Sequence, residues 1–94
     1  MISEASERRR WSREQIRSAR RVNLVPLMQC RGLELRDRSA DNYEVCRFPG
    51  LIVKQNYWRW PEENMAGNTI DFFTSIVGLT FSQAMQEIDS LYRL

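Results

Sequence analysis

The segment that most constrains the fold covers residues 57–81, because it contains an aromatic strand pattern and two signals for the start of a helix. Trp58 and Trp60 alternate with less apolar neighbours, which is the period-two pattern of a β-strand that buries one face. Pro61 should end this strand, because proline has no amide hydrogen to donate to a neighbouring strand. We therefore expect the core to form between this strand and the helices that follow it.

Two helices are predicted after the strand. Asn68 can cap the first amides of one helix, and Asp71, three residues later, places a negative charge at the same N-terminus. Thr80 and Gln83 have the spacing of a capping box for a second helix. Gly78, between the two, can adopt the left-handed conformation that often ends a helix. Apolar residues recur at spacings of three and four along both segments, so each helix should bury one face.

The first half of the chain predicts two further helices and a meander of short strands. Ser12 and Gln15 have the spacing of a capping box for one helix, and Asn23 can cap a second helix that Gly32 should close. After Gly32, apolar residues alternate with polar ones between turn-forming segments. The expected fold class is α+β, with a small antiparallel sheet of about four strands between two N-terminal and two C-terminal helices.

Length and composition favour one small domain. The chain has 94 residues, 43% of them hydrophobic and 28% charged, which is typical of a globular protein. Residues 1–11 contain little to bury, so we expect a flexible basic arm in which Trp11 has no core partner, followed by a single module at residues 12–94. No apolar run has the length of a membrane span, and the N-terminus is charged where a signal peptide is apolar. We therefore expect a cytoplasmic protein without membrane contact.

Short motifs occur here at the spacing of a known family. They are Val22-Asn23-Leu24-Val25, the segment from Tyr43 to Pro49, Ala66-Gly67-Asn68, Ile70-Asp71-Phe72 and Gly78-Leu79-Thr80-Phe81. Together they resemble the N-terminal zinc-binding domain of bacterial (DnaG-type) primases, in which an aromatic strand is followed by a Gly-rich turn and two helices. The resemblance covers residues 14–92 and implies a zinc-ribbon-like sheet.

The metal ligands of that family are largely replaced in this chain. The family holds zinc with three cysteines and one histidine, whereas the four positions carry Cys46, Pro49, Trp60 and Glu63 here. Because structural zinc takes four nitrogen or sulfur ligands, we expect no zinc and no other cofactor. Burial of Trp60 at a ligand position would replace part of the lost stabilisation. The chain is more similar to zinc-less relatives of this domain, which are found ahead of toprim (topoisomerase-primase) modules in proteins of plasmids and integrative mobile elements.

The charge of the chain is distributed unevenly. The formal net charge is +2. Residues 1–59 contribute +6, because they include thirteen basic and seven acidic residues, whereas residues 60–94 contribute −4, because they include one basic and five acidic residues. The strongest concentration is a set of arginines on one sector of the first predicted helix, which we call the arginine ridge. It consists of Arg10, Arg13, Arg17, Arg20 and Arg21. Arginine binds phosphate bidentately and stacks on bases, so the ridge indicates nucleic-acid contact; the alternative is a solvated helix face.

A second basic surface is predicted on the sheet. If Trp58 faces the core, then Tyr57 and Arg59 face the opposite side, where Lys54 on the preceding strand can join them. An exposed aromatic ring beside arginine can stack on the bases of a single strand. The alternative is that Tyr57 only covers the sheet.

These features favour binding over catalysis. The chain has no histidine, no plausible pair of nucleophile and base, no phosphate-binding loop and no carboxylate cluster for magnesium. We expect a non-enzymatic module that binds nucleic acid, with single-stranded or template DNA favoured. The resemblance implies a role in replication or transfer of a mobile genetic element, with a replication protein such as a polymerase, a helicase or a toprim module as partner. The alternative is a protein-interaction module, accessory or inhibitory, that docks an acidic partner through the arginine ridge.

Overall fold

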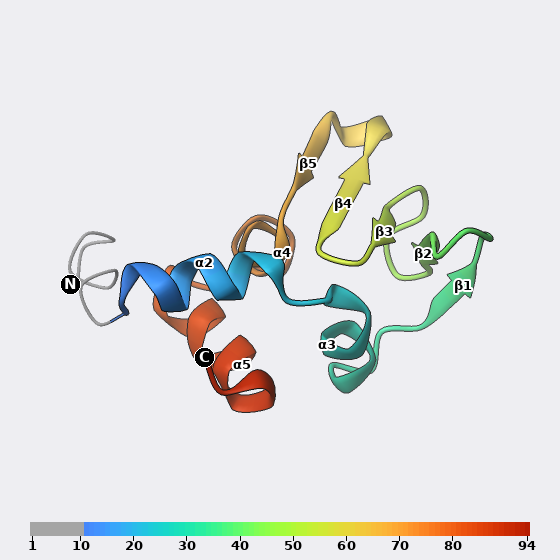
Figure 1. Ribbon diagram of the computed structural model, residues 1–94. Coiled ribbons are helices and arrows are strands. Elements are labelled where there is room, and N and C mark those ends of the chain that lie inside the picture. The colour runs from blue at the N-terminus through green and yellow to red at the C-terminus, as the bar shows by residue number, and fades with distance from the viewer. Residues whose placement is uncertain (1–10) are drawn as a thin grey trace.

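The computed structural model describes residues 11–94, so most of the expected basic arm, including Arg10, lies outside the described residues. A sheet of short strands forms one side of the molecule and the helices gather on the other (Figure 1). The elements in chain order are α2 (Arg13–Arg21), α3 (Leu24–Cys30), β1 (Leu35–Asp37), β2 (Tyr43–Val45), β3 (Ile52–Lys54), β4 (Tyr57–Trp60), a 3₁₀ turn (Pro61–Glu63), β5 (Met65–Gly67), α4 (Thr69–Asp71), a π-helical segment (Phe72–Val77) and α5 (Phe81–Tyr92). The expected α+β class is confirmed.

The sheet is an antiparallel meander in the order β1-β2-β3-β4-β5. It has five strands where about four were expected, because β5 continues the ladder after the 3₁₀ turn. Asn64 ends that turn in the left-handed conformation, with a φ of 54°, and this reverses the chain so that Met65 pairs with Trp60. Asparagine tolerates this conformation better than most residues, which makes the reversal inexpensive.

The helices cover the sheet face that carries Val45, Val53 and Trp58, all of which are buried. α3 packs on β3, and α4 packs on β5. Trp58 is only 1% exposed; its ring lies edge-on to Phe72 at 6.3 Å, and its Nε1–H donates to the Asn68 carbonyl at 2.9 Å. Burying one such side chain stabilises the fold by about 4–6 kcal/mol. The expectation that Trp58 belongs to the core is confirmed.

All three predicted N-terminal cap pairs form. Ser12 with Gln15, Asn68 with Asp71 and Thr80 with Gln83 are capping boxes in which each side chain bonds the partner's backbone amide. Gly78 has the expected left-handed conformation, with a φ of 87°. The helix expected between Asn68 and Gly78 changes from α to π geometry at Phe72. Within it the Thr74 hydroxyl lies 3.3 Å from the Ile70 carbonyl, a side-chain bond of the kind that competes with the backbone ladder and distorts helices.

Two tryptophans differ from their predicted environments. Trp11 was expected to have no core partner, but its ring is partly buried and packs against the core. Trp60 was expected to compensate by its burial for the stabilisation that zinc gives the primase domain. It is only partly buried, so it contributes less to the stability of the fold than a fully buried tryptophan would. Its Nε1–H donates to the Pro49 carbonyl at 3.0 Å and its ring lies edge-on to Phe48 at 5.6 Å. Within residues 11–94, no helix has the length and apolar character needed to cross a membrane.

Candidate nucleic-acid interface

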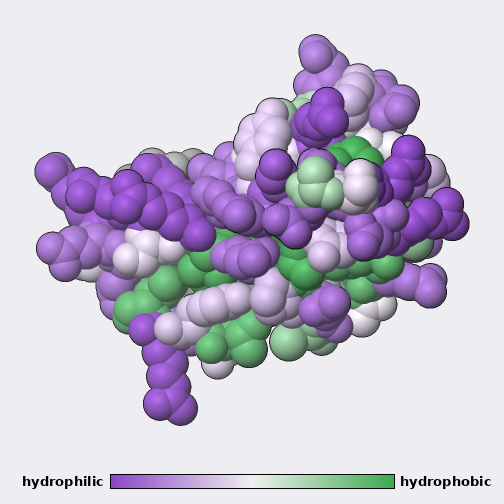
Figure 2. Space-filling model, turned by 45° about the vertical axis from the view of Figure 1, so that its right-hand side comes forward, coloured by the Kyte–Doolittle hydropathy of each residue, from purple (hydrophilic) through white to green (hydrophobic). Residues whose placement is uncertain are grey.

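The arginine ridge follows the exposed side of α2. Arg13, Arg17, Arg20 and Arg21 are all exposed, whereas Ala19 on the opposite side is fully buried. Figure 2 shows the ridge as a hydrophilic row along α2, directly above an apolar band. Arg10, the remaining member of the predicted ridge, lies outside the described residues. The ridge therefore presents four guanidinium groups to solvent from one short helix.

These four side chains are not neutralised by carboxylates. Across the part of the chain that the structure describes, none of them takes part in an ion pair. Other arginines do: Arg31 pairs with Glu87 at 2.7 Å, and Arg38 pairs with Glu44 at 2.9 Å. An unpaired arginine can bind a phosphate, and so release a counterion from the nucleic acid, without first breaking an internal ion pair. The arginines of the ridge are therefore more available to bind a phosphate than Arg31 and Arg38 are.

The second surface is the sheet face that points away from the helices, which we call the outer sheet face. Lys54 lies directly opposite Tyr57 in the register of β3 and β4, and Arg59 is two residues further along the same face. Tyr57 is 52% exposed, and Lys54 and Arg59 are exposed as well. The structure therefore brings these three predicted residues together, with the tyrosine ring half open to solvent.

The register adds two basic residues that the sequence reading did not include. Cross-strand partners share a face, and one row of partners crosses all five strands of the outer sheet face. This row consists of Arg36, Glu44, Ile52, Arg59 and Ala66. Arg36 belongs to it directly, and Arg38, just beyond β1, reaches it by its ion pair with Glu44. In the sequence, the alternation of Leu35 with Arg36 indicated a strand at this point. The pairing of β1 with β2 was needed to place Arg36 and Arg38 on the outer sheet face.

The turn between β3 and β4 joins the ridge to the outer sheet face. The Asn56 side-chain amide donates to the Arg20 carbonyl at 3.1 Å, and the Leu24 amide donates to the Gln55 carbonyl at 2.8 Å. From the other side, the buried Thr69 hydroxyl donates to the Val22 carbonyl at 2.5 Å. The C-terminal end of α2 is therefore anchored beside the hairpin that carries Lys54 and Tyr57.

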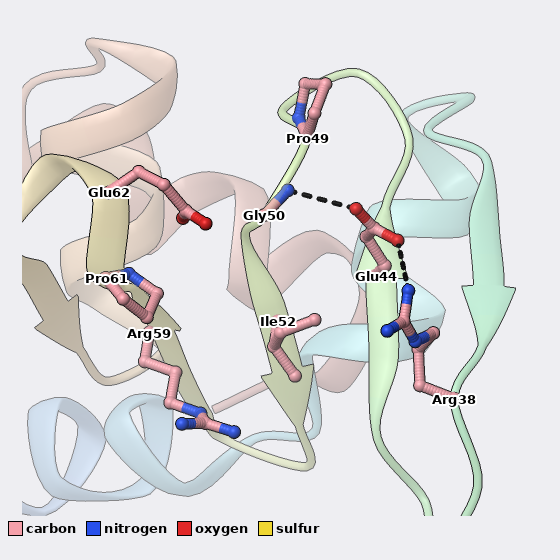
Figure 3. A pocket seen from close by; sticks show the side chains of 8 residues that line it. All are labelled: Arg38, Glu44, Pro49, Gly50, Ile52, Arg59, Pro61 and Glu62. Atoms are coloured by element: carbon pink, nitrogen blue, oxygen red, sulfur yellow. Dashed lines mark hydrogen bonds and ion pairs between the residues drawn. The ribbon is translucent and has the colours of Figure 1, made fainter.

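Glu44 is the one carboxylate in the row across the sheet, and both its oxygens are engaged. Oε1 accepts from Arg38, and Oε2 accepts from the Gly50 amide at 3.0 Å (Figure 3). The Gly50 hydrogen bond is the main reason that the pKa of Glu44 lies below its ordinary value; partial burial acts against it, and the charges of Arg38 and Arg36 add to it. Glu44 is thus held as an anion in a fixed position.

Within residues 11–94, no three histidine, cysteine or acidic side chains lie close enough together to hold a metal ion. Cys30 and Cys46 are free thiols, the first exposed and the second partly buried. At two of the positions that the sequence motifs align with the zinc ligands of the primase domain, the Trp60 indole donates a hydrogen bond to the Pro49 carbonyl.

Comparison with known proteins gives no match to a family model, to a curated protein or to a solved structure. The relationship with primase zinc-binding domains therefore stays a prediction that depends on the sequence motifs. The function has to be argued from the surfaces of the molecule.

Proposed function

We propose that this protein is a non-enzymatic module that binds single-stranded nucleic acid, with DNA favoured, through the arginine ridge and the outer sheet face. The observation that carries the proposal is the junction of the two surfaces at the hairpin turn: unpaired arginines lie on one side of Asn56, and Lys54 with the half-exposed Tyr57 lies on the other. Basic side chains follow a phosphate backbone, while an aromatic ring stacks on its bases.

The motifs shared with primase zinc-binding domains suggest the process in which the module acts. On that resemblance, it is a metal-free, zinc-ribbon-like module in DNA replication or transfer of a mobile genetic element, working in the cytoplasm. A polymerase, a helicase or a toprim module would then be its partner. The proposal of strand binding itself depends only on charge, exposure and register, so it can be tested separately from this role.

A protein-interaction module is the second candidate. It is favoured by two large apolar side chains near the end of α5, Leu91 and Tyr92, which are 44% and 39% exposed. Protein interfaces commonly combine an apolar centre with arginine at or near it. An acidic partner could therefore contact the arginine ridge. This candidate predicts a complex that persists after nuclease treatment and no affinity for oligonucleotides.

The deciding experiment is fluorescence anisotropy of labelled single-stranded and duplex oligonucleotides at several salt concentrations. We expect binding at low salt that weakens steeply as salt rises and that favours single strands. Neutralising two ridge residues, Arg17→Gln with Arg20→Gln, should weaken binding to a single strand and lower the magnitude of the salt slope by about 1.4, since each lost phosphate contact removes about 0.7.

A matched control makes the same change in net charge on other elements. Ser75→Glu with Gln86→Glu also lowers the net charge by two, at exposed positions on the π-helical segment and α5. This variant should bind nearly as well as the wild type. Equal weakening by both variants would mean that only overall charge matters, and no binding at low salt would remove the proposed function.

A further inference from the structure

The outer sheet face carries a hollow of about 470 Å³ over β2, β3 and β4. Its size is within the range of small-molecule sites. Ile52 lies in the middle of it, with Arg38 on one side and Arg59 on the other (Figure 3). Above them, the carboxylates of Glu44 and Glu62 are directed toward Gly50 from opposite sides. The hollow thus combines an apolar floor, two guanidinium groups and two carboxylates.

The two carboxylates differ in what they can still bind. Glu44 accepts from Arg38 and from the Gly50 amide, so its oxygens are occupied. Glu62 is exposed and makes no hydrogen bond or ion pair with any residue between 11 and 94. Its acceptors are therefore free for a ligand in the hollow.

Gly50 leaves room for the Glu62 carboxylate. A β-carbon built on Gly50 would overlap the Glu62 side chain, with Cδ only 2.7 Å away. Gly50 also has a φ of 92°, a conformation that glycine adopts at little cost. The absence of a side chain at this turn leaves the space in which the free carboxylate lies.

A pair of free carboxylate oxygens matches a ligand that presents two hydrogen-bond donors side by side. The Watson–Crick edge of guanine does so, with its N1–H and N2 amino group, and this edge is accessible only when the strand is unpaired. Thymine presents one donor between two carbonyl oxygens, which a carboxylate would repel. Arg59 could hold an adjoining phosphate, as could the guanidinium nitrogens of Arg38 that do not bond Glu44, and Ile52 provides an apolar surface under the base.

We propose that this hollow takes one base of the bound strand and selects guanine through Glu62, with Arg38 and Arg59 beside it. The inference rests on the proposed function, because it assigns a base preference to the same surface. Bidentate pairing with the matching base discriminates by about 1–3 kcal/mol elsewhere, which corresponds to roughly fivefold or more in affinity.

The test compares oligothymidine of about eleven nucleotides with the same strand carrying one central guanine, inosine or cytosine. We expect the guanine strand to bind at least fivefold more tightly than oligothymidine, and inosine, which lacks the N2 amino group, to lose most of this gain. Glu62→Gln should abolish the preference without weakening the binding of oligothymidine, because it removes a negative charge that repels the thymine carbonyls and the phosphates. Glu63→Gln is the matched control, because Glu63 is also exposed but does not line the hollow, and it should keep the preference.

The outcomes separate the two proposals. Tight binding of all strands without a guanine preference, or a preference that Glu62→Gln leaves intact, would overturn the base assignment and leave the proposed function standing. No binding of any strand at low salt would overturn both. Circular dichroism of the variants should match the wild type, since the Glu62 side chain forms no bond within the described residues.

Discussion

The anchoring of α2 by Thr69 gives the sharpest test of how the candidate interface is held together. Thr69 is fully buried, and its hydroxyl donates to the Val22 carbonyl at 2.5 Å and lies 3.4 Å from the Arg20 carbonyl. Thr69→Val keeps the shape of the side chain but leaves the Val22 carbonyl without this donor. Leaving a buried acceptor unsatisfied costs about 1–3 kcal/mol, partly offset by the added methyl group. We expect the free energy of unfolding to fall by about 1–2 kcal/mol.

Thr74→Val is the matched control for this substitution. The Thr74 hydroxyl bonds carbonyl groups of its own helical turn, at 3.3 and 3.4 Å, and does not connect two elements. Such local bonds contribute little, so Thr74→Val should change stability by less than about 0.5 kcal/mol. Thermal melts should separate the two variants, since a loss of 1–2 kcal/mol lowers the melting temperature of a domain of this size by roughly 4–15 °C. Equal stability of the two variants would refute the idea that Thr69 anchors the end of the arginine ridge.

Two further predictions concern the hollow on the outer sheet face. The pKa of Glu44 is depressed below 4.5, so Glu44 stabilises the fold above that pH and loses its contribution as the pH falls through the folded-state value. The stability difference between wild type and Glu44→Gln, measured by urea denaturation, should therefore shrink on acidification below pH 4.5; a difference independent of pH would contradict the assignment. Gly50→Ala and Gly78→Ala should destabilise the fold by similar amounts, because both positions have positive φ and the new β-carbon at Gly50 meets only the free end of the exposed Glu62 side chain. Thermal melts of the two variants check this; a larger loss for Gly50→Ala that disappears in a Glu62→Ala background would contradict it.

Features that depend on neighbouring residues in the chain were predictable from the sequence. The three capping boxes and the left-handed Gly78 form as expected, because their bonds connect residues within one helical turn. The burial of Trp58 also follows from strand alternation. Local patterns therefore predicted most of the helices and the α+β class.

Features that depend on pairing between distant segments were not predictable. β5 is a Met-Ala-Gly segment without any alternation of apolar and polar residues, so only its ladder with β4 identifies it as a strand. Trp11 packs against the core, which the basic residues around it in the sequence did not indicate. The hollow depends on the register of β2, β3 and β4 together with the position of Glu62 after the 3₁₀ turn, and no spacing in the sequence encodes that arrangement.

An NMR titration of the ¹⁵N-labelled protein with oligothymidine at low salt would locate the interface residue by residue. We expect the largest changes in amide chemical shift in α2 and in the β3–β4 hairpin, with Arg20 and Tyr57 among them, and we expect these changes to diminish together as salt is added. Amides around Leu91 and Tyr92 on α5 should be unaffected. Changes centred on α5, or no changes at all, would contradict a nucleic-acid interface formed by the arginine ridge and the outer sheet face.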